Sequence, residues 1–221
     1  MFLEVIAKSM KDVEKINKSL ANRIELCANL EVGGLTPDYN LVVSSTNQSK
    51  LPVNVIVRPT HRDFIYSKSE KKQIIKDIKF IRKTEANGIV FGALNKDNTI
   101  DLRFLKKVIK VKKHLEITFH KAFDEVNDFE KEYSILNELK VNTILTSGGQ
   151  NLKTGINVIK RLIDMKLNTN ILIGGGVNIS NLNDLLNLCQ NIHIGRLARK
   201  NNNYNEDIDV NFINSIKNMN T

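Results

Sequence analysis

The 221-residue sequence lacks several features that would place it outside the ordinary globular proteins. No apolar run approaches the ~20 residues that a membrane-spanning helix needs. The apolar segment 1–7 has no basic leader of the kind found in signal peptides and is interrupted by Glu4, so we interpret it as a strand. The two cysteines, Cys27 and Cys189, form no CxxC pair and no disulfide framework. We therefore expect a cytoplasmic protein with two free thiols and no membrane partner.

Basic residues are in excess, and the net charge is +9. A charge of this sign suits a nucleic-acid partner. However, the lysines lie on or beside helical stretches with acidic residues between them, as around Lys71 and Lys107, and no nucleic-acid-binding motif accompanies them. This pattern is typical of solvated outer helix faces. We expect no nucleic-acid partner, and a nucleic-acid or scaffold role for the basic surface ranks third among the possible functions.

Short apolar runs that end in a polar or glycine-rich tag recur along the chain. Helical periodicity separates most of them, which indicates parallel βαβ units. The repetition predicts an α/β fold, a closed (β/α)8 barrel of the TIM type, formed by a single domain over residues 1–221. In this fold the chemistry lies where the strands end. The predicted strands cover residues 2–7, 23–27, 54–58, 88–91, 116–120, 143–146, 170–173 and 191–194.

Helices are predicted between these strands from apolar stripes and capping residues. Ser9, Ser69 and Asp101 are the expected N-caps of the first three. Segment 30–51 is the exception, because Gly33, Gly34 and a polar run over 44–50 favour a long loop or a reduced helix over the barrel mouth. The predicted helices cover residues 9–21, 69–84, 101–113, 128–139, 152–167, 180–189 and 207–218.

The alternation of side chains along each strand separates inward from helix-facing residues. Glu4, Glu25, Arg58 and His120 belong to the sets that helices cannot cover, so they are expected to point inward. Because unpaired buried charges are costly, we predict that these four meet in one hydrogen-bonded network. The network is either a structural ion-pair cluster or a catalytic site, and the strand-end positions of Arg58 and His120 favour catalysis.

Two glycine-rich tags follow the sixth and seventh predicted strands. Successive backbone N–H groups beside a helix start make an anion site, and barrel enzymes often hold phosphate near this point. Close packing is the alternative reason for such glycines. The predicted ligand-binding residues are Thr146, Ser147, Gly148, Gly149, Gly174, Gly175 and Gly176.

One residue suits a soft metal ion. Cys27 lies at the end of the second predicted strand, and thiolates are good ligands for Cu(I). His120 or His193 could complete such a metal site only through the fold, because no second ligand lies nearby in sequence.

Taken together, the strand-end tags resemble the CutC family of copper homeostasis proteins, over nearly the whole chain. The resemblance implies a cytoplasmic TIM-type barrel that handles copper, with Cu(I) as the ion bound, and it adds Asp124 to the candidate catalytic residues. The motifs that carry it are Arg23-Ile24-Glu25-Leu26-Cys27, Gly33-Gly34-Leu35-Thr36-Pro37, Arg58-Pro59, Thr118-Phe119-His120 with Ala122-Phe123-Asp124, Leu145-Thr146-Ser147-Gly148-Gly149 and Gly174-Gly175-Gly176-Val177.

Two functions from different classes follow. The first is a copper homeostasis protein that binds Cu(I) through Cys27, with His120 as a helper. The second is a barrel enzyme that acts on a small anionic or phosphorylated substrate. In the enzyme, Glu25 or Glu4 serves as the acid–base and His120 as a proton donor or acceptor, while Arg58 and the glycine tags hold the anion. The expected partner is thus a copper ion or a small anionic ligand, and a homo-oligomer is an open alternative.

Overall fold

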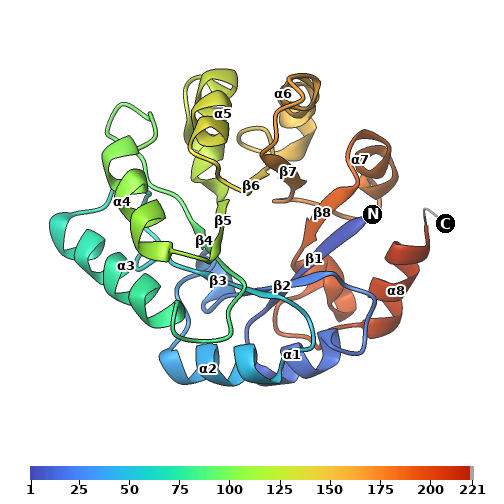
Figure 1. Cartoon of the computed structure of the whole chain (residues 1–221). Coiled ribbons are helices and arrows are strands. Elements are labelled where there is room, and N and C mark those ends of the chain that lie inside the picture. Colours follow the sequence, from blue (N-terminus) through green and yellow to red (C-terminus); the bar gives the residue numbers. More distant parts are fainter. Residues whose placement is uncertain (220–221) are drawn as a thin grey trace.

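The computed structural model describes residues 1–219, and within them eight parallel strands close into a barrel in chain order (Figure 1). The first strand pairs with both the second and the last, which closes the ring. The predicted TIM-type barrel is therefore confirmed. The strands are β1 (Phe2–Ala7), β2 (Arg23–Leu26), β3 (Val53–Ile56), β4 (Gly88–Phe91), β5 (Glu116–Phe119), β6 (Thr143–Thr146), β7 (Asn170–Ile173) and β8 (Asn191–Ile194).

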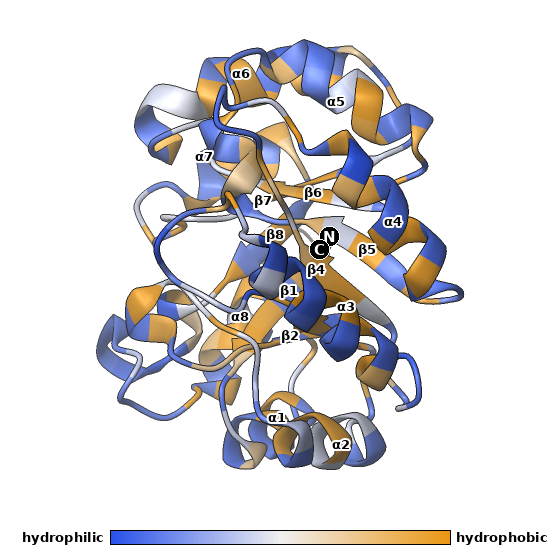
Figure 2. Ribbon diagram, turned by 90° about the vertical axis from the view of Figure 1, so that its left-hand side faces the viewer, coloured by the Kyte–Doolittle hydropathy of each residue, from blue (hydrophilic) through white to orange (hydrophobic). Residues whose placement is uncertain are grey.

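A helix follows each strand, and the helices form the outer ring of Figure 1. Apolar and polar residues alternate along these helices in Figure 2, because each helix buries one stripe against the strands. No helix in residues 1–219 is both long enough and apolar enough to span a bilayer. The helices are α1 (Met10–Ile16), α2 (Tyr39–Gln48), α3 (Lys68–Ile81), α4 (Leu102–Lys112), α5 (Phe129–Glu138), α6 (Leu152–Asp164), α7 (Leu182–Leu188) and α8 (Val210–Asn218).

The predicted helix starts are right in two cases and wrong in one. The side chains of Ser9 and Asp101 accept hydrogen bonds from the third residue after each, as N-caps do. Helix α3 begins two residues earlier than predicted, because Ser67 rather than Ser69 is its N-cap. The Glu70 carboxylate accepts a hydrogen bond of 2.7 Å from the backbone N–H of Ser67, which completes a capping box.

The segment after β2 contains more helix than the sequence indicates. A short 3-10 helix, Leu30–Val32, is followed by the ten-residue α2, whose N-cap is Asp38. The buried residues of α2 are Val42, Ser45 and Thr46, so two of the three are polar. An apolar stripe is therefore missing, and that is why periodicity favoured a loop here.

Two apolar layers lie on opposite sides of the strands. The larger layer packs between strands and helices, and the smaller one lies inside the barrel and includes Ile6, Cys27 and Val90. In parallel strands, residues that pair laterally point to the same side, and Glu4 pairs with both Arg23 and His193. The interior therefore has a polar layer beneath its small apolar one, as the side-chain alternation predicts.

Candidate active site

A cavity of about 330 Å³ opens where the strands end. This is the face on which barrel enzymes place their chemistry. Seven residues proposed from the sequence line the cavity, and the others lie beneath or beside it. The seven are Glu25, Cys27, Arg58, His120, Gly175, Gly176 and His193.

Glu4 lies below the cavity and is fully buried. One of its carboxylate oxygens is 2.5 Å from Arg23 Nε, and the other is 2.8 Å from His193 Nδ1. Burial alone would raise the pKa of Glu4, but Arg23 and His193 outweigh it and hold the pKa at about 2. Glu4 is therefore a permanent anion that fixes its two neighbours, and it is not free to exchange protons with a substrate.

Glu25 has the opposite character. Its carboxylate lies beside the Cys27 thiol and 3.5 Å from His193 Nε2. Burial, helped by the charge of Glu4, raises the pKa of Glu25 to about 7, although His193 acts against this rise. Burial also disfavours the charged form of His193, but Glu25 and Glu4 outweigh it and raise the pKa of His193. Glu25 and His193 therefore compete for a proton near neutral pH.

Glu4, Glu25 and His193 also offer one ligand atom each within 4.8 Å of one another. Two carboxylates and an imidazole are hard or borderline donors, so this set does not match the preference of Cu(I) for sulfur. Both Glu4 oxygens are already bonded, to Arg23 and to His193. A cation would have to displace these bonds, and the arrangement is better suited to holding a proton.

Arg58 does not join this buried network, contrary to our prediction. Its guanidinium donates instead to the backbone carbonyls of Gly33, Gly34 and His61 at 3.2–3.4 Å. It also lies over the Phe64 ring, 4.8 Å from the centroid. Arg58 therefore fixes the loop after β2 beside the cavity, and its positive charge lies at the cavity wall.

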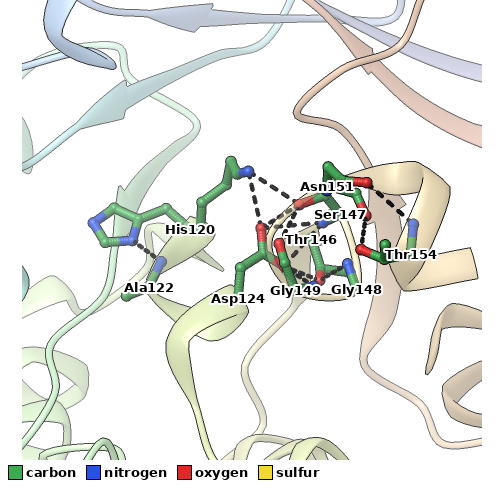
Figure 3. A network of polar contacts seen from close by, with 10 residues as sticks. His120, Ala122, Asp124, Thr146, Ser147, Gly148, Gly149, Asn151 and Thr154 are labelled. Atoms are coloured by element: carbon green, nitrogen blue, oxygen red, sulfur yellow. Dashed lines mark hydrogen bonds and ion pairs between the residues drawn. The ribbon is translucent and has the colours of Figure 1, made fainter.

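His120 also stands apart from the buried network. Its Nδ1 accepts a hydrogen bond of 3.1 Å from the backbone N–H of Ala122 (Figure 3). Burial and the charge of Arg58 lower the pKa of His120 to about 3. The imidazole is thus neutral, with its hydrogen on Nε2, and Nε2 is buried without a hydrogen-bond partner within residues 1–219.

The glycine-rich loop after β6 is filled by the protein itself, as Figure 3 shows. The Asp124 carboxylate accepts hydrogen bonds from Thr146 Oγ1, from Ser147 N and Oγ, and from Gly149 N, at 2.5–3.2 Å. Gly148 N donates to Thr146 Oγ1. The donors at residues 146–149 that were predicted to hold an external anion are thus taken up within the protein, most of them by the Asp124 carboxylate. Asp124 likewise has a structural contact here and does not line the cavity.

The sequence interpretation missed Lys121. Its Nζ lies 3.0 Å from Asp124 Oδ2 and 3.1 Å from Ser147 Oγ, and its side chain is 39% exposed at the cavity wall. A Cβ on Gly175 would lie 2.5 Å from this Nζ. The ammonium group therefore crosses directly over the loop after β7. The only sequence signal for Lys121 was its position directly after His120 in the family motif.

The loops after β7 and β8 supply further groups for an anion. Gly175 and Gly176 adopt positive φ angles and line the cavity, and their N–H groups have no protein acceptor within residues 1–219. Gly174 differs, because its N–H donates to Thr146 O and it does not line the cavity. Arg196, which follows β8, also lines the cavity and was not predicted. The predicted groups that remain available to an anion therefore lie on the β7 and β8 side.

Cys27 is the one sulfur-bearing residue at the cavity wall within residues 1–219. Burial and the neighbouring Glu25 raise the pKa of its thiol well above the ordinary value. Cys189 ends α7 and faces the Ile171 carbonyl, and it does not line the cavity. A soft-metal site in this cavity would therefore rest on one thiol.

These features define a (β/α)8 barrel with an acid–base cluster and basic groups at one mouth. The model of the CutC family matches residues 1–197, and the chain belongs to this family, as its motifs predict. A family protein CutC of Klebsiella pneumoniae (strain 342) is 40% identical over 185 residues, which are 83% of this chain and 75% of that protein. A family protein CutC of Bacteroides thetaiotaomicron is 37% identical over 182 residues, 81% of this chain and 73% of that protein.

Solved structures agree on the fold. A crystal structure from Streptococcus agalactiae, described as a candidate copper homeostasis protein CutC, has a TM-score of 0.82 and 28% identity. It covers 88% of this chain and 98% of that one. The N-(5'-phosphoribosyl)anthranilate isomerase of Pyrococcus furiosus has a TM-score of 0.60 at 14% identity, covering 98% of this chain and 96% of that one. The second likeness concerns the barrel alone.

Proposed function

We propose that the cavity is an active site in which Glu25 exchanges a proton with a small anionic substrate. The observation that carries this proposal is a buried carboxylate at the cavity wall whose pKa is raised to about 7. A general base is most effective when its pKa lies near the working pH. Carboxyl groups with strongly raised pKa values are concentrated at functional sites, because burying an ionisable group costs stability.

The environment of Glu25 supports the same role. His193 lies between Glu25 and Glu4, and Arg23 neutralises Glu4 from the other side. When Glu25 loses its proton, the nearby His193 imidazole, rather than bulk water, stabilises the carboxylate charge. The contacts leave Glu25 as the one carboxylate of the buried network that lines the cavity.

Basic groups at the same cavity support an anionic substrate. Lys121 and Arg196 line its wall, and the free N–H groups of Gly175 and Gly176 lie on the same side. Backbone N–H groups and ammonium groups together bind phosphate or carboxylate well. The charged end of a substrate therefore belongs near β7 and β8.

The titration of Glu25 tests the proposal through stability. Between about pH 5 and pH 7 the folded chain keeps a proton on Glu25 that the unfolded chain, with the ordinary pKa of 4.5, has lost. The folded state binds more protons, so the free energy of unfolding should fall as pH rises across this window, by about 2 kcal/mol. Urea unfolding at several pH values measures this slope.

The Glu25→Gln variant should lose most of this slope and be more stable than the wild type at pH 8. Glu138→Gln, which replaces an exposed glutamate on α5, should keep the wild-type slope. Identical slopes in the wild type and in Glu25→Gln would contradict the proposed role of Glu25.

Cu(I) binding is the second candidate, and the position of Cys27 at the cavity wall favours it. The name of the Streptococcus agalactiae relative points to copper, and the two free thiols suit a reducing cytoplasm. In this candidate copper is the cargo, held by the Cys27 thiolate with His120 as a helper. We place Cu(I) binding below the enzyme because most donors in the buried cluster are hard or borderline, whereas Cu(I) prefers sulfur.

Competition with a Cu(I) chelator under anaerobic conditions tests this candidate. Cys27→Ser should lose one bound equivalent of Cu(I), whereas Cys189→Ser, which changes the thiol outside the cavity, should keep it. Equal stoichiometry in Cys27→Ser and the wild type would remove Cys27 as the ligand.

A further inference from the structure

We propose that the reaction is the removal of a proton from the carbon next to a carbonyl group in a small anionic carbonyl compound. Glu25 takes the proton, and Nε2–H of His120 donates a hydrogen bond to the carbonyl oxygen. This inference rests on the proposed function and adds the reaction type, the class of substrate and the role of His120.

The first argument is the unsatisfied donor on His120. The hydrogen bond from Ala122 N to Nδ1 places the ring hydrogen on Nε2, and Nε2 has no partner within residues 1–219. A buried donor without an acceptor is costly, so such a group is expected where a ligand supplies the acceptor. Because Nε2 is shielded from water, an oxygen that reaches it is bonded in a dry environment, where hydrogen bonds are stronger.

The second argument is the chemical form of His120. With a pKa lowered to about 3, the ring stays neutral at any pH at which the protein would work. A neutral imidazole can polarise a carbonyl oxygen by hydrogen bonding without giving up its proton. Two titratable groups at one cavity with pKa values pushed apart in this way, Glu25 and His120, divide the roles of base and hydrogen-bond donor.

The third argument is placement. Strands β2 and β5 lie three positions apart in a ring of eight, so Glu25 and His120 approach the cavity from well-separated walls. A volume of about 330 Å³ is at the small end for ligand sites, which fits a molecule of a few carbons with one charged group. Lys121 and the Gly175–Gly176 loop line a third part of the cavity wall, where they can bind that charged group.

The step is balanced without any further reactant. A carboxylate oxygen of Glu25 takes the hydrogen as a proton, and the C–H electron pair forms a carbon–carbon double bond. The carbonyl π electrons move onto oxygen, where Nε2–H of His120 stabilises the enolate. Protonated Glu25 then returns the proton to carbon, and no oxidant or reductant takes part.

Exchange of the substrate's hydrogen for deuterium tests the inference. Dihydroxyacetone phosphate and pyruvate, one phosphorylated and one carboxylated, are each incubated with the protein in D2O, and ¹H NMR follows the C–H signal next to the carbonyl. We expect exchange faster than in protein-free solution for at least one of them, and the one that exchanges identifies the anionic group. If dihydroxyacetone phosphate is the compound that exchanges, glycerol 3-phosphate, which lacks a carbonyl, should bind without exchanging.

Variants separate the two roles. Glu25→Gln should slow exchange by about 100-fold or more, as expected for loss of a general base. His120→Leu should slow it by about 100-fold, whereas His120→Gln keeps an N–H donor and should retain more activity. Exchange unaffected by His120→Leu would overturn the role of His120. ¹⁵N NMR of the wild type provides a check that needs no variant. The His120 ring should be neutral with its hydrogen on Nε2 from pH 5 to pH 9. A hydrogen on Nδ1 would also overturn the role of His120.

The failures are distinguishable. If glycerol 3-phosphate binds and the stability slope of Glu25 is present, but neither carbonyl compound exchanges, this inference is overturned and the proposed function stands. If both the binding and the slope are absent, the proposed function fails, and this inference fails with it.

Discussion

Replacing Arg23 with leucine is expected to lower the free energy of unfolding by about 3–5 kcal/mol, because it leaves the Glu4 carboxylate buried without its counter-charge. Arg23 is 6% exposed, and its Nε lies 2.5 Å from the fully buried Glu4. His193 remains beside Glu4 but is shared with Glu25. Chemical denaturation of the wild type and of Arg23→Leu at pH 7 measures the loss.

Two further variants identify the cause. Glu4→Gln in the Arg23→Leu background removes the stranded charge and keeps an oxygen for His193, so it should recover part of the stability. Arg161→Leu breaks an equally short ion pair to Glu130 on the surface and should change the unfolding free energy by no more than about 1 kcal/mol. If Arg23→Leu were as mild as Arg161→Leu, the buried pair would not matter to the fold.

Gly155→Ala is expected to destabilise the protein by about 2–3 kcal/mol, although glycine-to-alanine changes inside helices usually stabilise by about 1 kcal/mol. Gly155 lies in α6, and a Cβ there would be 2.0 Å from the carbonyl oxygen of Ser147. That oxygen belongs to backbone and cannot rotate away. The helix must therefore shift off the loop after β6, which is tied to Asp124 by several hydrogen bonds.

Asn157→Ala provides the matched control, because Asn157 is exposed on the same helix. It should change the unfolding free energy by less than about 1 kcal/mol, in the stabilising direction. Thermal and urea unfolding of both variants measure the contrast. If Gly155→Ala left the unfolding free energy unchanged, α6 would not be in tight contact with this loop.

Side-chain alternation predicted which residues enter the barrel but not which of them meet. Glu4, Glu25 and His120 all lie on the inner side, as expected. Alternation gives no height along the barrel axis and no lateral partner, since both depend on strand register. Register places Arg23 and His193 beside Glu4, while Arg58 and His120 lie beyond the strand ends.

The loop after β6 shows a second limit. Its Ser-Gly-Gly pattern is the same whether an external anion or an internal one fills it. The residue that decides is Asp124, which is more than 20 positions earlier in the chain. Local pattern could not reveal that contact, because it depends on the turn after β5 folding back over β6. Helix α2 was underestimated for a related reason, since its buried Ser45 and Thr46 resemble loop residues.

The Asp124 contact also bears on how a ligand would be received. A loop that already surrounds a carboxylate has no need to rearrange when an anion arrives next to it. Lys121, held by Asp124 and Ser147, stands at the cavity wall before any ligand is present. The site is preorganised, so binding carries little of the entropic cost of ordering a loop. The ligand-free and ligand-bound forms should therefore share one conformation along this side of the barrel.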